Sequence, residues 1–342
     1  MLSQTKSLLN IRNLTTCFHG EKGKITAVDR LSFDVYKGSA VGLVGETGSG
    51  KTTVGLSILR LIPYILKAKH GPHNHIKIVS RGEIQGGEIY FNGRDLLKLT
   101  EDEMREIRGK EISMIFQSPI ASMHPMAIIG YQTGEPKRAH DRIRWEKIRE
   151  IVFEYLGKVE LREPKKRFFL DPHRFSIGEG QRIMIAMALI CNPSLLIADE
   201  PTSSLDVLVQ RQVLELLKTM KKEFDLSMIL TTHDLAVVAE MADYVGVMYA
   251  GRLLEYGDVL TIFKNPAHPY TRGLLSCAPR IDREVSFEEA IPGSPPDPYD
   301  LPEGCLFRPR CRFSKDMCSR EEPVSREIEP GHLVSCLRAG EI

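Results

Sequence analysis

The sequence predicts an α/β fold of the P-loop class, and three observations support this prediction. The segment 45–53 has the sequence GETGSGKTT, follows the apolar run 40–44 and precedes a helix-like run at 54–60. A strand, a glycine-rich turn and a helix start thus follow one another, which is the setting of a phosphate-binding loop. Further along the chain, apolar runs alternate with helical patterns, as in a mostly parallel sheet.

The glycine-rich turn suits a nucleotide polyphosphate. Successive backbone N–H groups and a helix N-terminus face an anion there, and the glycines let the backbone approach it closely. Lys51 can reach the β- and γ-phosphates, and the Thr52 hydroxyl can ligate Mg²⁺. The residues that we expect to bind the nucleotide in this turn are Gly45, Thr47, Gly48, Ser49, Gly50, Lys51, Thr52 and Thr53.

Composition and charge exclude some classes of partner and of protein. The 342 residues contain 46 Lys and Arg against 45 Asp and Glu, so the net charge gives no reason to expect a nucleic acid partner. The N-terminal segment lacks the apolar core of a signal peptide, and no window of about 18 uninterrupted apolar residues occurs. We therefore expect a chain without a membrane span.

Polar residues end three of the expected buried strands. Asp199 and Glu200 follow an apolar run at 195–198, and two acids at such a place are costly unless they meet a cation or take part in catalysis. In a P-loop protein, Asp199 is expected to face Mg²⁺ and Glu200 the attacking water. Gln117 and His233 also follow apolar runs, at the strand ends where α/β sheets place ligand contacts. Either of them alone would more often be an ordinary surface or structural residue.

Two further groups lie in the N-terminal third. Residues 8–44 alternate in polarity over the short runs 8–14 and 31–35, which the polar segment 18–24 separates. They predict a β-rich layer, in which Phe18 either stacks on an adenine ring or packs in a hairpin core. His70, His73 and His75 are close enough in sequence to bind a metal, but no carboxylate or cysteine cluster accompanies them. An exposed polar loop is therefore the preferred interpretation of that segment.

The middle of the chain, residues 120–190, is predicted to be mainly helical. Within it, Ser176 precedes the apolar helical run 183–191 and is expected to be an N-cap. A helix N-terminus after such a turn is also a second possible anion site.

Taken in order and spacing, these motifs resemble the ATPase subunit of ABC transporters over residues 8–336. The resemblance implies a P-loop (RecA-like) ABC ATPase core with an antiparallel β subdomain, a helical subdomain and a cysteine-containing C-terminal extension. The implied divisions are the β subdomain with the first part of the core, the helical signature subdomain, the second part of the core and the extension: 1–118, 119–190, 191–264 and 265–342.

The resemblance also implies roles for the polar residues. In this family, two ATPases stack head to tail, and each ATP lies between one P-loop and the signature turn of the partner. Glu200 would polarise the hydrolytic water, and His233 would sense the γ-phosphate. The implied catalytic residues are Lys51, Gln117, Glu200 and His233, and the implied Mg²⁺ ligands are Thr52, Gln117 and Asp199.

The turn that would face the partner's nucleotide departs from the family pattern. Ser176, Gly178 and Gln181 match the signature, and Asp206 matches the D-loop, but Ile177 stands where the family has a glycine. Glycine there lets backbone N–H groups approach the partner's γ-phosphate. We therefore expect Ile177 to weaken the ATP site on the partner's P-loop. The partner would be a sister ATPase, or a second copy of this chain.

The C-terminal part of the chain resembles one subgroup of this family. The segments NPAHPYT at 265–271 and IPGSPP at 291–296 look like the extension of dipeptide and oligopeptide importers, a subgroup that includes some nickel and antimicrobial-peptide uptake systems. This implies an ATP-hydrolysing subunit that energises peptide import at the cytoplasmic face of the cell membrane. Its partners would be a second ATPase, two membrane permeases and, indirectly, an extracytoplasmic peptide-binding protein.

Four cysteines are concentrated near the C-terminus. Their spacing lacks the close Cys-x2-Cys pairs of zinc ribbons, and wider loops suit a [4Fe–4S] cluster, which some members of the subgroup carry. Zn²⁺ is the alternative, and two disulfides come third. We also expect nearby arginines to offset the negative charge of a cluster. The cysteines are Cys305, Cys311, Cys318 and Cys336, and the arginines are Arg308, Arg310 and Arg312.

Two functions of other classes stay open at this point. A soluble ABC-type ATPase acting on ribosomes or DNA usually has two fused cassettes or a long coiled coil, and this chain has neither. An iron–sulfur regulatory protein that retains an ATPase fold is the other alternative, but all the catalytic residues expected within one chain are present.

Overall fold

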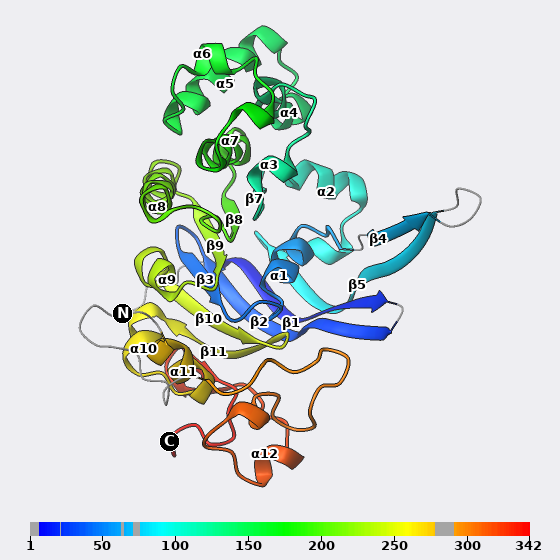
Figure 1. The fold of residues 1–342 in the computed structure, drawn as a ribbon, viewed down its shortest axis with the longest axis vertical. Coiled ribbons are helices and arrows are strands. Elements are labelled where there is room, and N and C mark those ends of the chain that lie inside the picture. Colours follow the sequence, from blue (N-terminus) through cyan, green and yellow to red (C-terminus); the bar gives the residue numbers. More distant parts are fainter. Residues whose placement is uncertain (1–6, 21, 63–64, 71–75, 278–290) are drawn as a thin grey trace. The chain divides into compact units, whose positions relative to one another are not determined.

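The computed structural model describes residues 7–20, 22–62, 65–70, 76–277 and 291–342, without the side chains of 65–70 and 76–80. Figure 1 labels the helices and strands, and the chain divides into two compact units. The first contains the chain up to Tyr36, Ala40–Leu97 and Thr232–Ile342, and the second contains Lys37–Ser39 and Lys98–Thr231. The four divisions expected from the sequence stay predictions.

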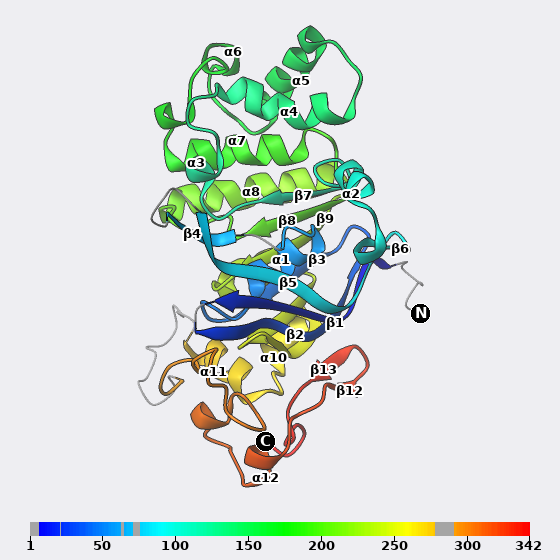
Figure 2. The ribbon, with the colours of Figure 1, turned by 90° about the vertical axis from the view of Figure 1, so that its right-hand side faces the viewer.

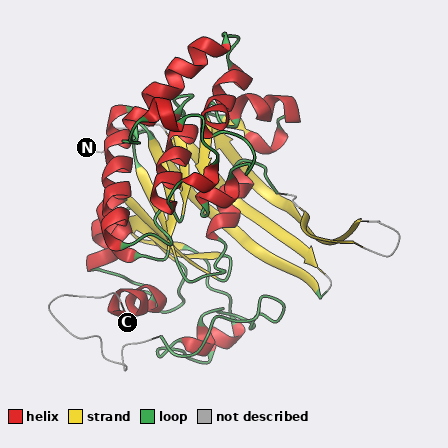
Figure 3. Cartoon of the chain, turned by 45° about the horizontal axis from the view of Figure 1, so that its top comes forward, coloured by secondary structure: helices red, strands yellow, loops and turns green. Residues whose placement is uncertain are grey.

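The first unit contains an antiparallel sheet built on a long hairpin (Figure 3). Its strands, in spatial order, are β2 (Gly23–Tyr36), β1 (Ser7–Gly20), β5 (Ile76–Phe91) and β4 (Ile65–His70), with β6 (Arg94–Asp95) paired to β5. β1 and β2 are longer than the alternation predicts, because pairing continues through the polar segment to Gly20 opposite Gly23. Register shifts between Ile11 and Cys17 interrupt the alternation, and bulges of this kind explain the difference.

A second group of strands in the first unit surrounds the strand that leads to the P-loop. β3 (Ala40–Val44) is buried at all five positions, which agrees with its uninterrupted apolar sequence. It pairs in parallel with β10, and β10 forms an antiparallel hairpin with β11. The neighbouring strands are β10 (Tyr244–Tyr249), β11 (Arg252–Asp258), β13 (His332–Val334) and β12 (Arg326–Glu329).

Short helices complete the first unit. They are α1 (Lys51–Ile58), α9 (Leu235–Met241), α10 (Val259–Lys264), α11 (Pro269–Cys277) and α12 (Met317–Arg320), with a 3₁₀ turn at Arg308–Arg310. Three aromatic rings join the C-terminal extension to the core. Tyr249 of β10 lies 4.8 Å from the Tyr270 ring and 5.4 Å from the Phe307 ring, measured between centroids. The extension therefore packs on the strand next to β3.

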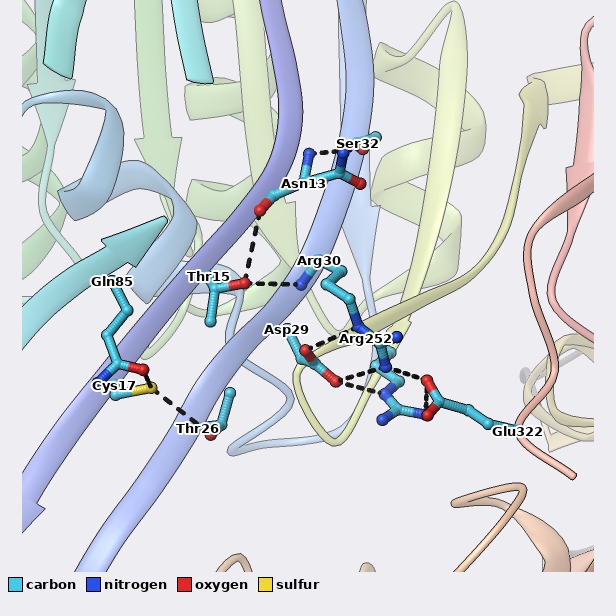
Figure 4. Close-up of polar contacts among 10 residues, drawn as sticks. All are labelled: Asn13, Thr15, Cys17, Thr26, Asp29, Arg30, Ser32, Gln85, Arg252 and Glu322. Atoms are coloured by element: carbon cyan, nitrogen blue, oxygen red, sulfur yellow. Dashed lines mark hydrogen bonds and ion pairs between the residues drawn. The ribbon is translucent and has the colours of Figure 1, made fainter. Parts of the chain in front are cut away.

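An ion-pair network provides a second attachment for the extension (Figure 4). Arg252 at the start of β11 bonds Asp29 of β2 at 2.7 Å and Glu322 of the extension at 2.9 Å. Arg30 also pairs with both acids. Burial opposes the ionisation of Asp29, but hydrogen bonds from Arg30 and Arg252 outweigh it and lower the pKa of this carboxyl group.

The second unit combines parallel strands with most of the longer helices (Figure 2). Its strands pair in the order β7 (Ile112–Ile115), β8 (Leu195–Asp199) and β9 (Ser227–Thr232). Its helices are α2 (Glu101–Ile107), α3 (Pro119–Ser122), α4 (Ile129–His140), α5 (Trp145–Lys158), α6 (Pro164–Arg167), α7 (Ile177–Leu189) and α8 (Val207–Glu223). Because the strands are parallel, their C-terminal ends meet at one edge. Within the described parts of the chain, no helix is both long and apolar enough to cross a bilayer.

Local helix signals in the second unit are confirmed. Ser176 caps α7, as predicted, and forms a capping box with Glu179; Thr100 caps α2 in the same way with Glu103. In both boxes, the hydroxyl oxygen accepts from the backbone N–H three residues on, and the glutamate accepts from the N-cap N–H. The beginnings of these helices are therefore set by local hydrogen bonds.

The histidine-containing insertion differs in part from the expected loop. His70 is the last residue of β4, which pairs with β5, so part of the segment is a strand. His73 and His75 lie outside the described residues, as does the side chain of His70. A loop was expected throughout because the segment is polar, but backbone pairing at a sheet edge does not require apolar side chains.

The buried carboxylate of Glu255 connects β11 to the extension and gives a stability prediction. It accepts hydrogen bonds from the backbone N–H groups of Ala267 at 2.7 Å and His268 at 3.0 Å, and from His332 Nε2 at 2.7 Å. Removing it in Glu255→Ala leaves three buried donors unpaired, so we expect a loss of about 3 kcal/mol in the free energy of unfolding. Urea denaturation measures this loss. Glu329→Ala, at an exposed position of β12, is the control, and equal stability of the two variants would contradict the assignment.

Candidate nucleotide-binding site

The P-loop joins β3 to α1 in the first unit. The Lys51 ammonium lies over its own loop, where it donates to the carbonyl oxygens of Gly45 at 2.7 Å and Glu46 at 3.0 Å, and to Ser49 Oγ at 3.3 Å. Lys51 and Ser49 are buried, whereas Thr52 is exposed at the start of α1. The lysine is therefore held at the loop that the sequence predicts to bind phosphate.

Two glycines are required by the shape of this loop. Gly45 has φ +153°, and a Cβ atom there would lie 2.1 Å from the carbonyl oxygen of Met248. Gly50 has φ +100°, and a Cβ atom there would lie 2.2 Å from the carbonyl oxygen of Ala27. Both contacts are with backbone atoms, which cannot move aside as a side chain can. The loop thus packs against β10 and β2 without side chains at these two positions.

Glu46 is a residue of the site that the sequence analysis missed. Its carboxylate accepts two hydrogen bonds from Arg310, at 2.7 and 2.9 Å, and its backbone N–H donates to Tyr270 Oη at 3.1 Å. Arg310 was expected to offset the charge of a cysteine-bound cluster, and the structure pairs it with the P-loop instead. Glu46 and Arg310 are 264 residues apart, so no local pattern indicates this pair.

A pocket lies beside the P-loop. Its lining includes Thr47 and Gly48 of the loop, Ala27 of β2, and Pro295 and Pro296 of the extension. Phe18 is not among its lining residues. This half-buried side chain of β1 covers Gly82 of β5, where a Cβ atom would lie 2.6 Å from the Phe18 ring. Its stacking on adenine stays a prediction.

The second unit holds the two predicted acids. Asp199 ends β8 with 2 % of its surface exposed, and one of its carboxylate oxygens accepts a hydrogen bond from the buried hydroxyl of Thr231. Glu200 follows with φ +48°, a conformation that non-glycine residues adopt rarely and at a cost of about 1 kcal/mol or more. Its backbone N–H donates to the Thr231 carbonyl at 2.9 Å, and its carbonyl accepts from Ser203 Oγ at 2.9 Å. Hydrogen bonds thus hold both the backbone N–H and the backbone carbonyl of Glu200.

The polar residues predicted to follow the other two strands, Gln117 and His233, are exposed. Gln117 lies two residues beyond β7, after Phe116, whose backbone N–H donates to Met184 Sδ. His233 lies directly after β9 and before α9. Gln117 belongs to the second unit and His233 to the first. The roles of both residues stay predictions.

The signature turn is ordered by the capping box rather than by glycine. Ile177 is 48 % exposed at the first position of α7, and Gly178 lies against Val209 of α8. The Glu179 carboxyl is partly buried, which opposes ionisation, but hydrogen bonds from Arg167 and Ser176 outweigh this and lower its pKa. Ser176 is also exposed, so the two residues at the tip of the turn are open to a partner.

Two other residues expected to face the partner's nucleotide have structural roles within this chain: one caps a helix and the other is buried. Asp206 caps α8, since its carboxylate accepts from the N–H groups of Leu208 at 3.1 Å and Val209 at 3.0 Å. Gln181 is only 2 % exposed inside α7, and its Nε2 has no hydrogen-bond partner among the described residues. Sequence spacing could not show the burial of Gln181, and its place in the signature motif stays a prediction.

The four C-terminal cysteines line a single pocket of the extension, and none is in a disulfide. Burial raises the pKa of the Cys305 thiol to about 11, and it also raises the pKa values of Cys311 and Cys336. Over the described residues, no three His, Cys, Asp or Glu side chains are placed so that they could hold one metal ion. The zinc and iron–sulfur expectations therefore have no support from a formed metal site.

Two glycines of the P-loop give a matched stability test. Gly45 and Gly48 both have positive φ, but a Cβ atom at Gly48 meets nothing within 4 Å. Gly45→Ala adds the contact with Met248, so we expect it to destabilise the protein by about 2 kcal/mol more than Gly48→Ala does. Urea unfolding of the two variants measures the difference. Equal unfolding midpoints would show that the close contact at Gly45 is relieved without cost.

Comparison with known proteins identifies the family. The family model described as "ABC transporter" matches residues 28–203, and the model described as "Oligopeptide/dipeptide transporter, C-terminal region" matches residues 254–318. The first match contains the P-loop and the acids that end β8. The second contains part of the C-terminal extension, including three of its four clustered cysteines.

Similar proteins match along nearly the whole chain. The oligopeptide transport ATP-binding protein OppD of Escherichia coli is 42 % identical over 98 % of this chain and 94 % of its own length. The dipeptide transport ATP-binding protein DppD of Bacillus subtilis is 42 % identical over 97 % of this chain and 94 % of its own. The ATP-binding cassette MJ0796, solved as a dimer with ADP and Pi, shares the fold with a TM-score of 0.62 at 24 % identity, covering 73 % of this chain and 98 % of that one. The chain belongs to the ABC transporter family, as one of its ATPase cassettes.

Proposed function

We propose that this chain binds and hydrolyses ATP to energise the import of dipeptides or oligopeptides. The observation that carries the proposal is the near full-length similarity to proteins named for oligopeptide and dipeptide transport. The ordered P-loop, with Lys51 held at its centre, supports the ATP-binding part. The match of residues 254–318 to the peptide-transporter C-terminal region supports the choice of substrate class.

In the proposed reaction, the backbone of the P-loop and the Lys51 ammonium bind the phosphates. To do so, the ammonium exchanges its contacts with the Gly45 and Glu46 carbonyls for phosphate oxygens. Mg²⁺ would neutralise phosphate charge, and its proposed ligands are oxygen donors of the kind that it prefers: Thr52, Gln117 and Asp199.

The other proposed catalytic residues lie just after the ends of strands. Glu200 polarises the attacking water, and the rigid turn around it favours a fixed carboxylate direction. His233 contacts the γ-phosphate, and Gln117 contacts Mg²⁺ and the membrane partner. Phe18 stacks on the adenine ring.

The proposed assembly contains two ATPases and two membrane permeases, with a peptide-binding protein outside the membrane. Each ATP lies between one P-loop and a partner's signature turn, to which this chain contributes Ser176, Gly178 and Gln181, together with Asp206. The exposed Ile177 side chain keeps the turn from approaching the partner's γ-phosphate as closely as glycine would. The partner is therefore proposed to be a different ATPase, with the weaker ATP site on its P-loop. We propose that the chain acts at the cytoplasmic face of the membrane.

The other functions are less favoured. The relatives reported above are named for peptide transport, and none of these names refers to ribosomes or DNA. Uptake of nickel or of antimicrobial peptides would use the same ATPase chemistry. Transport assays with radiolabelled dipeptide, oligopeptide and Ni²⁺ in cells with and without this chain would separate these substrates.

The role of Glu200 gives a prediction for the assembled transporter. Glu200→Gln keeps the size of the side chain but removes the charge that polarises water, so we expect ATP hydrolysis to fall at least about 100-fold. The measurement is phosphate release by the transporter purified with its co-expressed subunits. Glu215→Gln, at an exposed position of α8, is the control. Hydrolysis that hardly falls in Glu200→Gln would mean that the working site lies on the partner's P-loop.

We also propose a [4Fe–4S] cluster in the cysteine pocket. Four thiols around one pocket support it, and a cluster binds each thiolate to a different iron, so it requires wider spacing than one Zn²⁺ ion does. Bound there, a cluster would supply four iron–thiolate bonds that cross-link the extension. Its proposed role is structural.

Metal analysis tests the cluster. Protein purified without oxygen should be brown, absorb near about 400 nm and contain about four irons per chain. Cys318→Ser should lose most of the iron, whereas Cys277→Ser, outside the pocket, should retain it. A colourless preparation with stoichiometric zinc would exclude the cluster, and a sample without either metal would leave the cysteines as free thiols.

A further inference from the structure

The C-terminal extension contacts the P-loop through a partly buried ion pair. Arg310 Nη1 and Nη2 bond the two carboxylate oxygens of Glu46 at 2.7 and 2.9 Å. The Arg310 side chain is 6 % exposed and that of Glu46 is 28 % exposed. This parallel, two-bond geometry is the strongest arrangement of an arginine with a carboxylate, and it fixes direction as well as distance.

The extension itself orients the guanidinium group. Arg310 Nε donates to the Pro292 carbonyl at 2.8 Å, and Nη2 also donates to the Gly293 carbonyl at 3.3 Å. The guanidinium carbon lies 5.7 Å from the centre of the Tyr249 ring. Arg310 therefore has a direction that is set by residues of the extension and of β10.

The backbone of Glu46 is held as firmly as its side chain. Tyr270 Oη, on α11, accepts a hydrogen bond from the Glu46 N–H, while the Glu46 carbonyl accepts from the Lys51 ammonium. The Lys51 that would bind phosphate thus rests on a residue whose other two polar groups are fixed by the C-terminal part of the chain. A shift of Glu46 would displace a contact of Lys51.

We propose that Arg310 is a positioning residue for nucleotide binding, which acts by neutralising Glu46 and by holding it away from the phosphate-binding face of the P-loop. This inference rests on the proposed binding of ATP by the loop. Without Arg310, the Glu46 carboxylate would be an unpaired negative charge in the same loop that receives a polyphosphate. Like charges at such a place oppose binding, and the opposition grows with the charge of the nucleotide.

Neutralisation of Glu46 and simple support of the fold predict different results when Arg310 is removed. If Arg310 only stabilised the extension, its loss would weaken the binding of ATP and ADP to the same extent. Neutralisation of Glu46 predicts a larger loss for ATP, and it predicts that removing the Glu46 charge compensates for the loss of Arg310. It also predicts that added salt reduces the loss, because salt screens the repulsion at the exposed side of the loop.

Nucleotide titration of the full chain tests the proposal. The dissociation constants of MgATP and MgADP are measured by calorimetry for the wild-type protein, Arg310→Met, Glu46→Gln and the double variant. We expect Arg310→Met to weaken MgATP binding about tenfold and MgADP binding about threefold, and the double variant to bind MgATP within about twofold of Glu46→Gln. Arg320→Met, which changes an exposed arginine of the same extension, should bind as the wild type does.

The outcomes separate the proposal from the function on which it rests. A wild-type chain that does not bind MgATP would contradict the proposed function. A wild-type chain that binds, together with an Arg310→Met variant within twofold of it, would overturn the role of Arg310. Equal losses for both nucleotides, or a double variant as weak as Arg310→Met, would overturn the charge mechanism. If Arg310→Met does not fold, Arg310→Gln, which keeps hydrogen-bond donors, replaces it with the same expectations.

Discussion

The P-loop depends on one constraint: its backbone must stay open to an anion and yet hold a single conformation. At Gly45 and Gly50 the loop cannot use side chains for packing, because it meets the backbone of other strands there. Its conformation must therefore be set from outside. Here the support comes from β10, from β2 and, at Glu46, from a segment more than two hundred residues away in sequence. Binding of an anion then requires little reorganisation of the loop.

Local chemistry made much of the core predictable from the sequence. The glycine-rich turn, the acids after β8 and the capping boxes each depend on residues within a few positions of one another, and local hydrogen bonds suffice to specify them. The paired lengths of β1 and β2 were underestimated, because bulges break the alternation on which the prediction relied. The burial of Gln181 and the pairing of Arg310 with Glu46 depend on tertiary packing, so motif spacing could not reveal them.

In the signature turn, the residues that begin the helix are not the residue that departs from the family pattern. Ser176 and Glu179 begin α7 by exchanging hydrogen bonds, and neither bond involves the residue at position 177. Replacing the family's glycine with isoleucine thus leaves the start of the helix intact, and what changes is the exposed apolar side chain at its tip. Asp206 likewise has a local structural role, because its carboxylate caps α8. We therefore expect Ile177 to leave the stability of this chain unchanged, since its proposed effect is on the ATP site of a partner.

The extension has little regular structure to support itself. Between residues 291 and 342 it contains one 3₁₀ turn, a four-residue helix and two short strands. Segments of this size bury too little apolar surface to fold alone and usually need cross-links or anchors. Anchors are present at Glu46, at the Tyr249 ring, at Glu255 and at the Arg30–Arg252–Glu322 network, and the cysteine pocket is the proposed place of a further cross-link. Arg310 lies directly before Cys311, so a cluster bound as proposed would also restrain the arginine that pairs with Glu46 of the P-loop.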